Sequence, residues 1–199
     1  MFPLGTPVLP HTALPLHVFE DRYRRMMHDL MGSDRTLGFV MIERGSEVGG
    51  GDVRTGVGTL ARVVEARELD DGRWLMIAAG MHRLRVVEWL PDDPYPRARV
   101  EVLEAGRPAG GPEPGMQAAI RRIAALAAEL DMPGPPIDVE LSADPVAAAY
   151  QALASAPVGP LDTQRILELD DEDERIAAVR SALRDAEDLL RLRLADGAA

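Results

Sequence analysis

The segment from Leu14 to Met27 constrains the fold more than any other, because it joins an extended stretch directly to an amphipathic helix. Pro10 and Pro15 fix φ and lack an N–H, so they favour an edge strand over a central one. After them, apolar residues recur at helical spacing, at Phe19, Tyr23, Met26, Met27, Leu30 and Met31. This helix should end near Gly32 and needs a sheet to cover, and we expect Phe19, Tyr23 and Met26 to anchor it there.

The residues around this segment are typical of such a sheet. Short β-rich runs predict edge strands at 8–10 and 14–16 and further strands at 37–42, 57–64, 73–78, 83–89 and 96–104. Asp71-Gly72 predicts a hairpin turn, because glycine accepts positive φ, and Gly80 is expected to end the strand that follows. Residues 1–108 are therefore predicted to form an antiparallel β-rich subdomain of about six strands plus one helix.

A helical period replaces the β pattern after a linker rich in glycine and proline at 105–115. Apolar spacing predicts a helix at 116–130, and Asp144-Pro145 resembles an N-cap followed by a first-turn proline. A short helix is expected at 160–167 and a long one at about 171–195, whose acidic start complements the helix dipole. Residues 109–199 are predicted to form an α-helical subdomain, and the fold class is α+β.

The net charge of −11 and the isoelectric point near 4.8 argue against nucleic acid and anionic membranes as partners, because binding phosphate requires a basic face. Neither a basic, apolar leader nor an apolar run long enough to span a membrane is evident. We therefore expect a cytoplasmic protein.

The absence of cysteine and lysine removes most catalytic and metal chemistry. Without cysteine there is no disulfide, thiolate nucleophile or cysteine-based zinc site. Without lysine there is no P-loop lysine or Ser–Lys dyad, and no Gly-Lys motif or helix follows the triple glycine at 49–51. The four histidines lack zinc-ligand spacing, and the five serines lie outside any Gly-x-Ser-x-Gly motif, although a triad assembled in space stays open. We expect no catalytic residue, metal or cofactor.

Several segments match one family in order and spacing. They are Phe2-Pro3-Leu4-Gly5, Val8-Leu9-Pro10, Leu14 to Glu20 with Arg22-Tyr23, Gly56 to Ala61, Asp71-Gly72-Arg73, Gly80 to Val86, and Leu167 to Ile176. Together they resemble the amino-terminal substrate-binding domain of Lon proteases in its stand-alone form. The resemblance covers the first hundred residues well, and the Gly/Pro-rich insert at 106–115 departs from it.

This resemblance implies a PUA-like β subdomain followed by a helical one, with a role in recognising protein substrates and no catalytic residue. Our first hypothesis is a module that binds unfolded or extended polypeptide segments, in association with a protease or another protein. Met27, Met31, Met81 and Trp89 are the predicted partner-binding residues, since methionine repacks around varied apolar side chains. The alternative for the methionines is an ordinary core position. A structural adaptor or homodimer is the second hypothesis, and an unrecognised hydrolase is the third.

Overall fold

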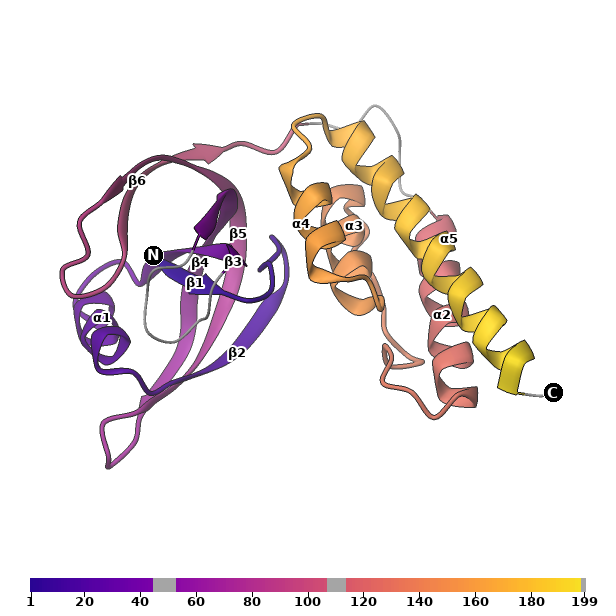
Figure 1. Cartoon of the computed structure of the whole chain (residues 1–199), viewed down its shortest axis with the longest axis horizontal. Helices are drawn as coiled ribbons and strands as arrows, with labels where there is room; N and C mark the ends of the chain where they lie inside the picture. Colours follow the sequence, from indigo (N-terminus) through magenta and orange to yellow (C-terminus); the bar gives the residue numbers. More distant parts are fainter. Residues whose placement is uncertain (45–52, 107–113, 198–199) are drawn as a thin grey trace. The chain divides into compact units, whose positions relative to one another are not determined.

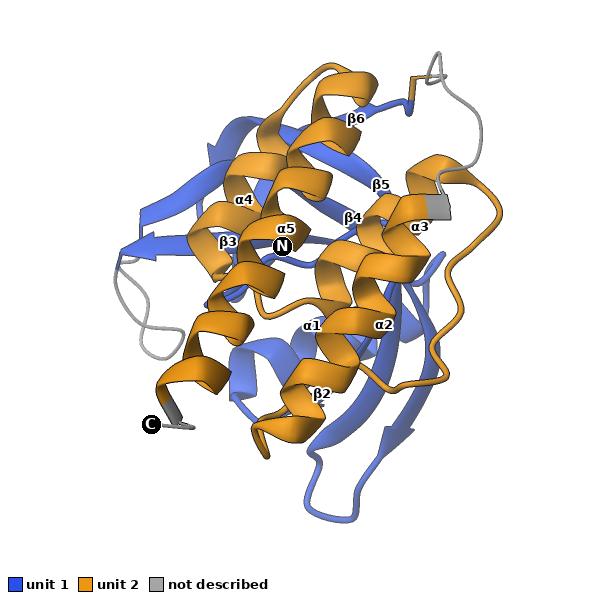
Figure 2. Ribbon diagram, turned by 90° about the vertical axis from the view of Figure 1, so that its right-hand side faces the viewer, with its two compact units in different colours: residues 1–105 blue, residues 106–199 orange. Residues whose placement is uncertain are grey.

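The computed structural model describes residues 1–44, 53–106 and 114–197, which divide into two compact units, Met1–Ala105 (unit 1) and Gly106–Ala199 (unit 2) (Figure 2). The described residues form six strands with one early helix, followed by four further helices. The predicted α+β fold class is therefore confirmed. The predicted boundary after residue 108 and the triple glycine at 49–51 lie outside the described residues.

Unit 1 is built around one six-stranded sheet (Figure 1). Its elements are β1 (Phe2–Leu4), β2 (Ala13–Val18), α1 (Asp21–Met31), β3 (Thr36–Arg44), β4 (Val53–Glu68), β5 (Trp74–Leu90) and β6 (Arg97–Leu103). The strand order is β1-β3-β4-β5-β2, and β6 also pairs with β5. Because β1 and β3 pair in parallel while the other pairs are antiparallel, the sheet is mixed and not purely antiparallel. The connection from β1 to β3 includes α1, which gives the chain the length that a parallel pairing needs.

The expectation of a strand at residues 8–10 is wrong. These residues are tied to the sheet by other hydrogen bonds: Thr59 Oγ1 donates to the carbonyl of Val8 at 2.6 Å, and the N–H of His11 donates to the carbonyl of Gly80 at 2.9 Å. The edge strand is instead β1, which pairs with β3. A strand of three residues that contains Pro3 is too short to show a period in the sequence.

Gly80 does not end a strand, because β5 continues through it to Leu90. A Cβ at Gly80 would lie 2.2 Å from the carbonyl oxygen of Leu9, so glycine here allows the two backbones to approach closely. The runs predicted as separate strands at 73–78 and 83–89 are two parts of one strand. β2 pairs with the first part and β6 with the second.

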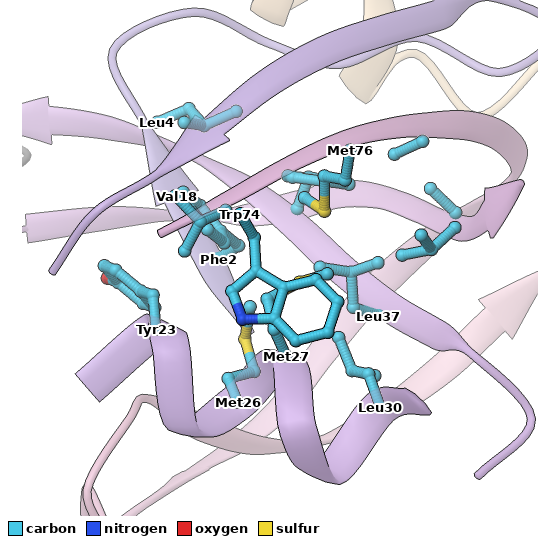
Figure 3. Packing of buried hydrophobic residues seen from close by; sticks show 14 of the residues in the cluster. Phe2, Leu4, Val18, Tyr23, Met26, Met27, Leu30, Leu37, Trp74 and Met76 are labelled. Carbon is cyan, nitrogen blue, oxygen red and sulfur yellow. The ribbon is translucent and has the colours of Figure 1, made fainter. Parts of the chain in front are cut away.

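Helix α1 packs its apolar face on the core of unit 1 (Figure 3). Tyr23 and Met26 are buried there, as predicted, and the rings of Phe2 and Tyr23 stack with their centroids 4.3 Å apart. Phe19 does not join them, since 54% of its surface is exposed. The helix begins at Asp21 with Glu20 as its N-cap, so Phe19 precedes the helix and is not carried on its apolar face.

Unit 2 consists of α2 (Pro114–Glu129), α3 (Pro145–Ser155), α4 (Pro160–Glu168) and α5 (Glu172–Gly197). The predicted N-cap is confirmed: the side chain of Asp144 accepts a hydrogen bond from the N–H of Ala147 at 2.8 Å, and Pro145 occupies the first turn. Helix α5 packs along α2 and α3 (Figure 2), and its buried apolar residues are Ile176, Val179, Leu183, Ala186 and Leu190.

The start of α5 is held by a buried arginine. Only 2% of the Arg175 side chain is exposed, and it forms an ion pair with the buried carboxylate of Glu172. The same guanidinium donates to the carbonyl groups of Leu169 and Asp170, which precede the helix, and lies 5.9 Å from the centre of the Tyr150 ring on α3. One side chain therefore joins the α4–α5 loop, the first turn of α5 and α3.

A second ion pair links α2 to α5. Arg122 donates to both carboxylate oxygens of Glu187, at 2.8 and 3.0 Å, and Arg191 also contacts this carboxylate. The carboxylate of Glu187 is buried, whereas the Arg122 side chain is about half exposed. The hydrogen bonds from Arg122 lower the pKa of Glu187 against the opposing effect of burial.

We expect Glu187 to stabilise unit 2 in a pH-dependent way. Because its pKa is lowered by folding, its contribution is complete above the ordinary glutamate pKa of about 4.3 and is lost as the pH falls through the lower, folded-state pKa. Glu187→Gln should reduce the free energy of unfolding by about 1–2 kcal/mol at about pH 7, since it removes a charged hydrogen bond, and by less at about pH 3. Urea unfolding followed by circular dichroism measures both values.

The neighbouring Asp188→Asn variant is the control, because this exposed carboxylate only approaches Arg191 at 3.8 Å. A difference between wild type and Glu187→Gln that stays the same at both pH values would contradict this role.

Candidate functional site

The structure places two of the predicted partner-binding residues on α1, next to the core. Met27 has 0% of its surface exposed and belongs to the core itself, and Met31, one turn further along, is partly buried against the same core. A partner could touch Met27 only after α1 had moved. The ordinary core position that the sequence left open for the methionines describes Met27 well.

The other two predicted residues, Met81 and Trp89, lie on β5. Trp89 is 37% exposed, and the guanidinium of Arg54 lies 4.7 Å from the centre of its ring. Met81 and Trp89 are eight positions apart along the strand, which corresponds to at most about 26 Å. None of the four predicted residues lines either of the two hollows described below, so the structure does not gather them into one site.

One hollow lies on the outer face of the sheet, opposite α1. It has a volume of about 560 Å³. We call it the β5 trough, and it is lined by Pro15, Leu16, His17, Glu65, Arg67, Leu75, Met76 and Ile77. β5 supplies its floor, and the neighbouring strands β2 and β4 supply its two sides.

Strand pairing arranges the trough in two rows. One row consists of Pro15, Ile77 and Glu65, and the next consists of His17, Leu75 and Arg67. The alternation of a strand sends Trp74, Met76 and Ala78 into the core and leaves the residues between them outside. As a result 41% of Leu75 is exposed and Ile77 is half-buried.

A bulge in β4 decides which side chains border the trough. The register with β5 shifts between Val63 and Glu65, so Val64 is unpaired. Val63 points into the core, and without this extra residue Glu65 and Arg67 would point inward as well. The bulge therefore brings two opposite charges to the outer face. Neither has an ion-pair partner among the residues that the structure describes.

The other hollow lies beside α1 and also measures about 560 Å³. The hydroxyl of Tyr95 donates to Asp29 of α1 at 2.8 Å at this hollow. Its apolar residues include Met26, Leu30 and Leu37, which are already buried in the core. Leu60, Leu90 and Ala98 also line it and are half-buried, whereas Leu75 on the floor of the trough is 41% exposed.

Three of the described serines have structural roles at helix ends, while Ser181 lies exposed within α5. Ser33 and Ser155 each donate to a carbonyl of the preceding helical turn, and Ser142 accepts from the N–H of Asp144. Ser46 lies outside the described residues. Within the described ranges, no three residues among His, Asp and Glu are grouped to hold a metal ion, and no helix combines the length and apolarity needed to cross a membrane.

Comparison with known families identifies the chain's relatives. Residues 1–185 match the ATP-dependent protease La (LON) substrate-binding domain. The chain belongs to this family. The match comprises the substrate-binding domain of Lon and includes no ATPase or peptidase domain.

Curated relatives are much longer than this chain. The Lon protease of Dictyoglomus thermophilum is 29% identical over 99 residues, which cover 50% of this chain and 12% of that protein. Lon protease 2 of Sorangium cellulosum is 34% identical over 104 residues, or 51% of this chain and 13% of that protein. Lon protease 2 of Herpetosiphon aurantiacus is 24% identical over 196 residues, or 95% of this chain and 24% of that protein. The chain therefore spans a quarter or less of the length of these Lon proteases.

Solved structures show the same fold. A Lon N-terminal domain protein from Xanthomonas campestris superposes with a TM-score of 0.66 at 20% identity, covering 90% of this chain and 95% of that one. The N-terminal domain of a Mycobacterium avium complex Lon protease gives a TM-score of 0.55 at 19% identity, covering 92% and 97%. The Lon N-terminal fold thus extends over both units.

The sequence contains one signal for the trough. Residues 74–79 are apolar without exception, so a strand with only one face in the core must leave apolar side chains outside. The position of Glu65 and Arg67 has no comparable signal, because it depends on the bulge.

Proposed function

We propose that unit 1 is a recognition module that binds extended, apolar polypeptide segments in the β5 trough. The observation that carries this proposal is the apolar floor of the trough, where Leu75 is exposed and Ile77 half-buried between the side chains of β2 and β4. Contiguous apolar surface that a folded chain leaves in contact with water is characteristic of interaction sites.

The shape of the trough favours an extended segment as its occupant. Same-face side chains of an extended chain recur every two residues, at about 6.6–6.8 Å, which is also the spacing of the two rows along β5. Two successive same-face side chains can therefore contact Ile77 and Leu75 in turn. Phe19, whose ring centroid lies 6.1 Å from that of His17, continues the apolar surface beyond the end of β2.

Membership of the Lon substrate-binding family supports the same proposal, since the family is named for binding substrates. The relatives above are Lon proteases of which this chain spans one part. We extend the proposal accordingly: a segment bound in the trough is passed to a protease. A structural adaptor, a homodimer and a hydrolase stay as the other hypotheses.

Leu75→Glu is expected to weaken binding about tenfold, because it places a charge on the apolar floor and removes about 1–1.5 kcal/mol of apolar contact. The measurement is the fluorescence anisotropy of a labelled short peptide with alternating valine and serine residues. Val87→Glu is the matched control, since Val87 is an exposed apolar residue of β5 that does not line the trough. Equal affinity of the two variants, or no binding of the peptide to the wild-type chain, would refute the proposal.

A further inference from the structure

We propose that Arg67 makes the β5 trough selective for apolar segments that carry a carboxylate side chain beside their apolar residues. This inference rests on the proposed function and specifies, in addition, the charge that the bound segment carries. The occupant is an extended polypeptide with an aspartate or glutamate over Leu75 and an apolar residue two positions away over Ile77, so that both side chains face the trough.

The first observation is the position of Arg67. It stands next to Leu75 in the row that ends at His17, on the outer face and exposed to solvent. Neighbouring strands are about 4.8 Å apart, so a segment lying over β5 passes within reach of the guanidinium. Arginine presents a fork of donors that matches a carboxylate.

The second observation is that Arg67 has no ion-pair partner among the described residues, in contrast to Arg73 and Arg99. Arg73 pairs with Asp71 at 2.7 Å, and Arg99 pairs with Glu88 at 2.8 Å. Arg67 is thus a cation at the trough whose charge the described chain leaves unmatched.

Glu65 restricts where the carboxylate can lie. It occupies the adjacent row, beside Ile77, about 6.6–6.8 Å further along the strand. A carboxylate over Leu75 meets Arg67, whereas the same group over Ile77 meets Glu65 and is repelled. We therefore expect the affinity for a segment to depend on the position of its acidic residue as well as on the presence of that residue.

The net charge of the whole chain disfavours an acidic peptide, so it cannot be the cause of the expected selectivity. At −11 the protein would repel an acidic peptide in general. Charges more than about 8 Å apart are largely screened at physiological salt, so at the trough the nearby Arg67 should outweigh them.

Three labelled peptides test the inference: an alternating valine–serine peptide in which the central valine, on the face that contacts the trough, is replaced by glutamate, glutamine or lysine. Their anisotropy is measured with the full-length wild type, Arg67→Glu, and Arg99→Glu as a control that changes the net charge equally. The wild type and the control should bind the glutamate peptide about 2–5-fold more tightly than the glutamine peptide and the lysine peptide least, as expected for an exposed ion pair. Arg67→Glu should reverse this order.

The outcomes separate this inference from the proposed function. Equal binding of the three peptides to the wild type, or the same order in Arg67→Glu as in the wild type, would overturn the inference and leave the proposed function standing. A failure of all three peptides to bind would overturn both.

Discussion

Arg175→Ala is expected to reduce the free energy of unfolding of unit 2 by about 3–5 kcal/mol, because it leaves the buried carboxylate of Glu172 without its cation. The substitution also removes the donors that satisfy the carbonyl groups of Leu169 and Asp170 before α5. Chemical denaturation followed by circular dichroism at the helical band measures the loss.

Arg165→Ala is the matched control for this experiment. Arg165 pairs with Asp162 at 2.9 Å with the same spacing of three residues, but both side chains are exposed. Exposed pairs contribute about 0–1 kcal/mol, so this variant should be close to the wild type. If the two variants lost the same stability, the start of α5 would not depend on the buried pair.

Gly58→Ala is expected to destabilise unit 1 by about 3 kcal/mol or more. A Cβ at this position of β4 would lie 1.9 Å from the carbonyl oxygen of Phe39 and 2.9 Å from a methyl group of Val40. Both atoms belong to β3, so the clash can be relieved only by separating two paired strands. Both tryptophans, Trp74 and Trp89, lie in unit 1, so their fluorescence during denaturation reports on this unit specifically.

Gly56, two residues earlier on the same strand, provides the control. A Cβ there would have no atom within 4 Å, and alanine should be neutral or stabilise the fold by up to about 1 kcal/mol through the unfolded state. A similar loss in both variants would show that the requirement at Gly58 is not one of space.

Long periodic segments could be predicted from the sequence, and features that depend on contacts distant in sequence could not. The helix before Gly32 and the Asp144 N-cap were predicted because their signals are local. Phe19 fits the helical period equally well, but the period does not show that the helix begins after it. Gly80 resembles the end of a strand in the sequence, and only the nearby carbonyl of Leu9 explains why β5 continues through it.

The candidate site was less predictable than the fold. Met27 and Met31 were chosen for a chemical property, the adaptability of methionine, which is equally useful in a core and on a surface. Glu65 and Arg67 border the trough because one extra residue in β4 turns them outward. Such a bulge adds no turn residue or break in composition that a sequence pattern could detect.

The residues of strand β5 alternate between the core and the trough, so the number of residues in the strand determines both. Between Trp74 and Ala78, even-numbered residues fill the interior and odd-numbered residues form the floor of the trough. Inserting or deleting one residue within this stretch would exchange the two sets, bringing Trp74 and Met76 to the solvent and Leu75 to the interior. Changes in length can be accepted at the β4–β5 turn but not between Trp74 and Ala78. The floor of the trough can therefore be altered only by substituting its odd-numbered residues.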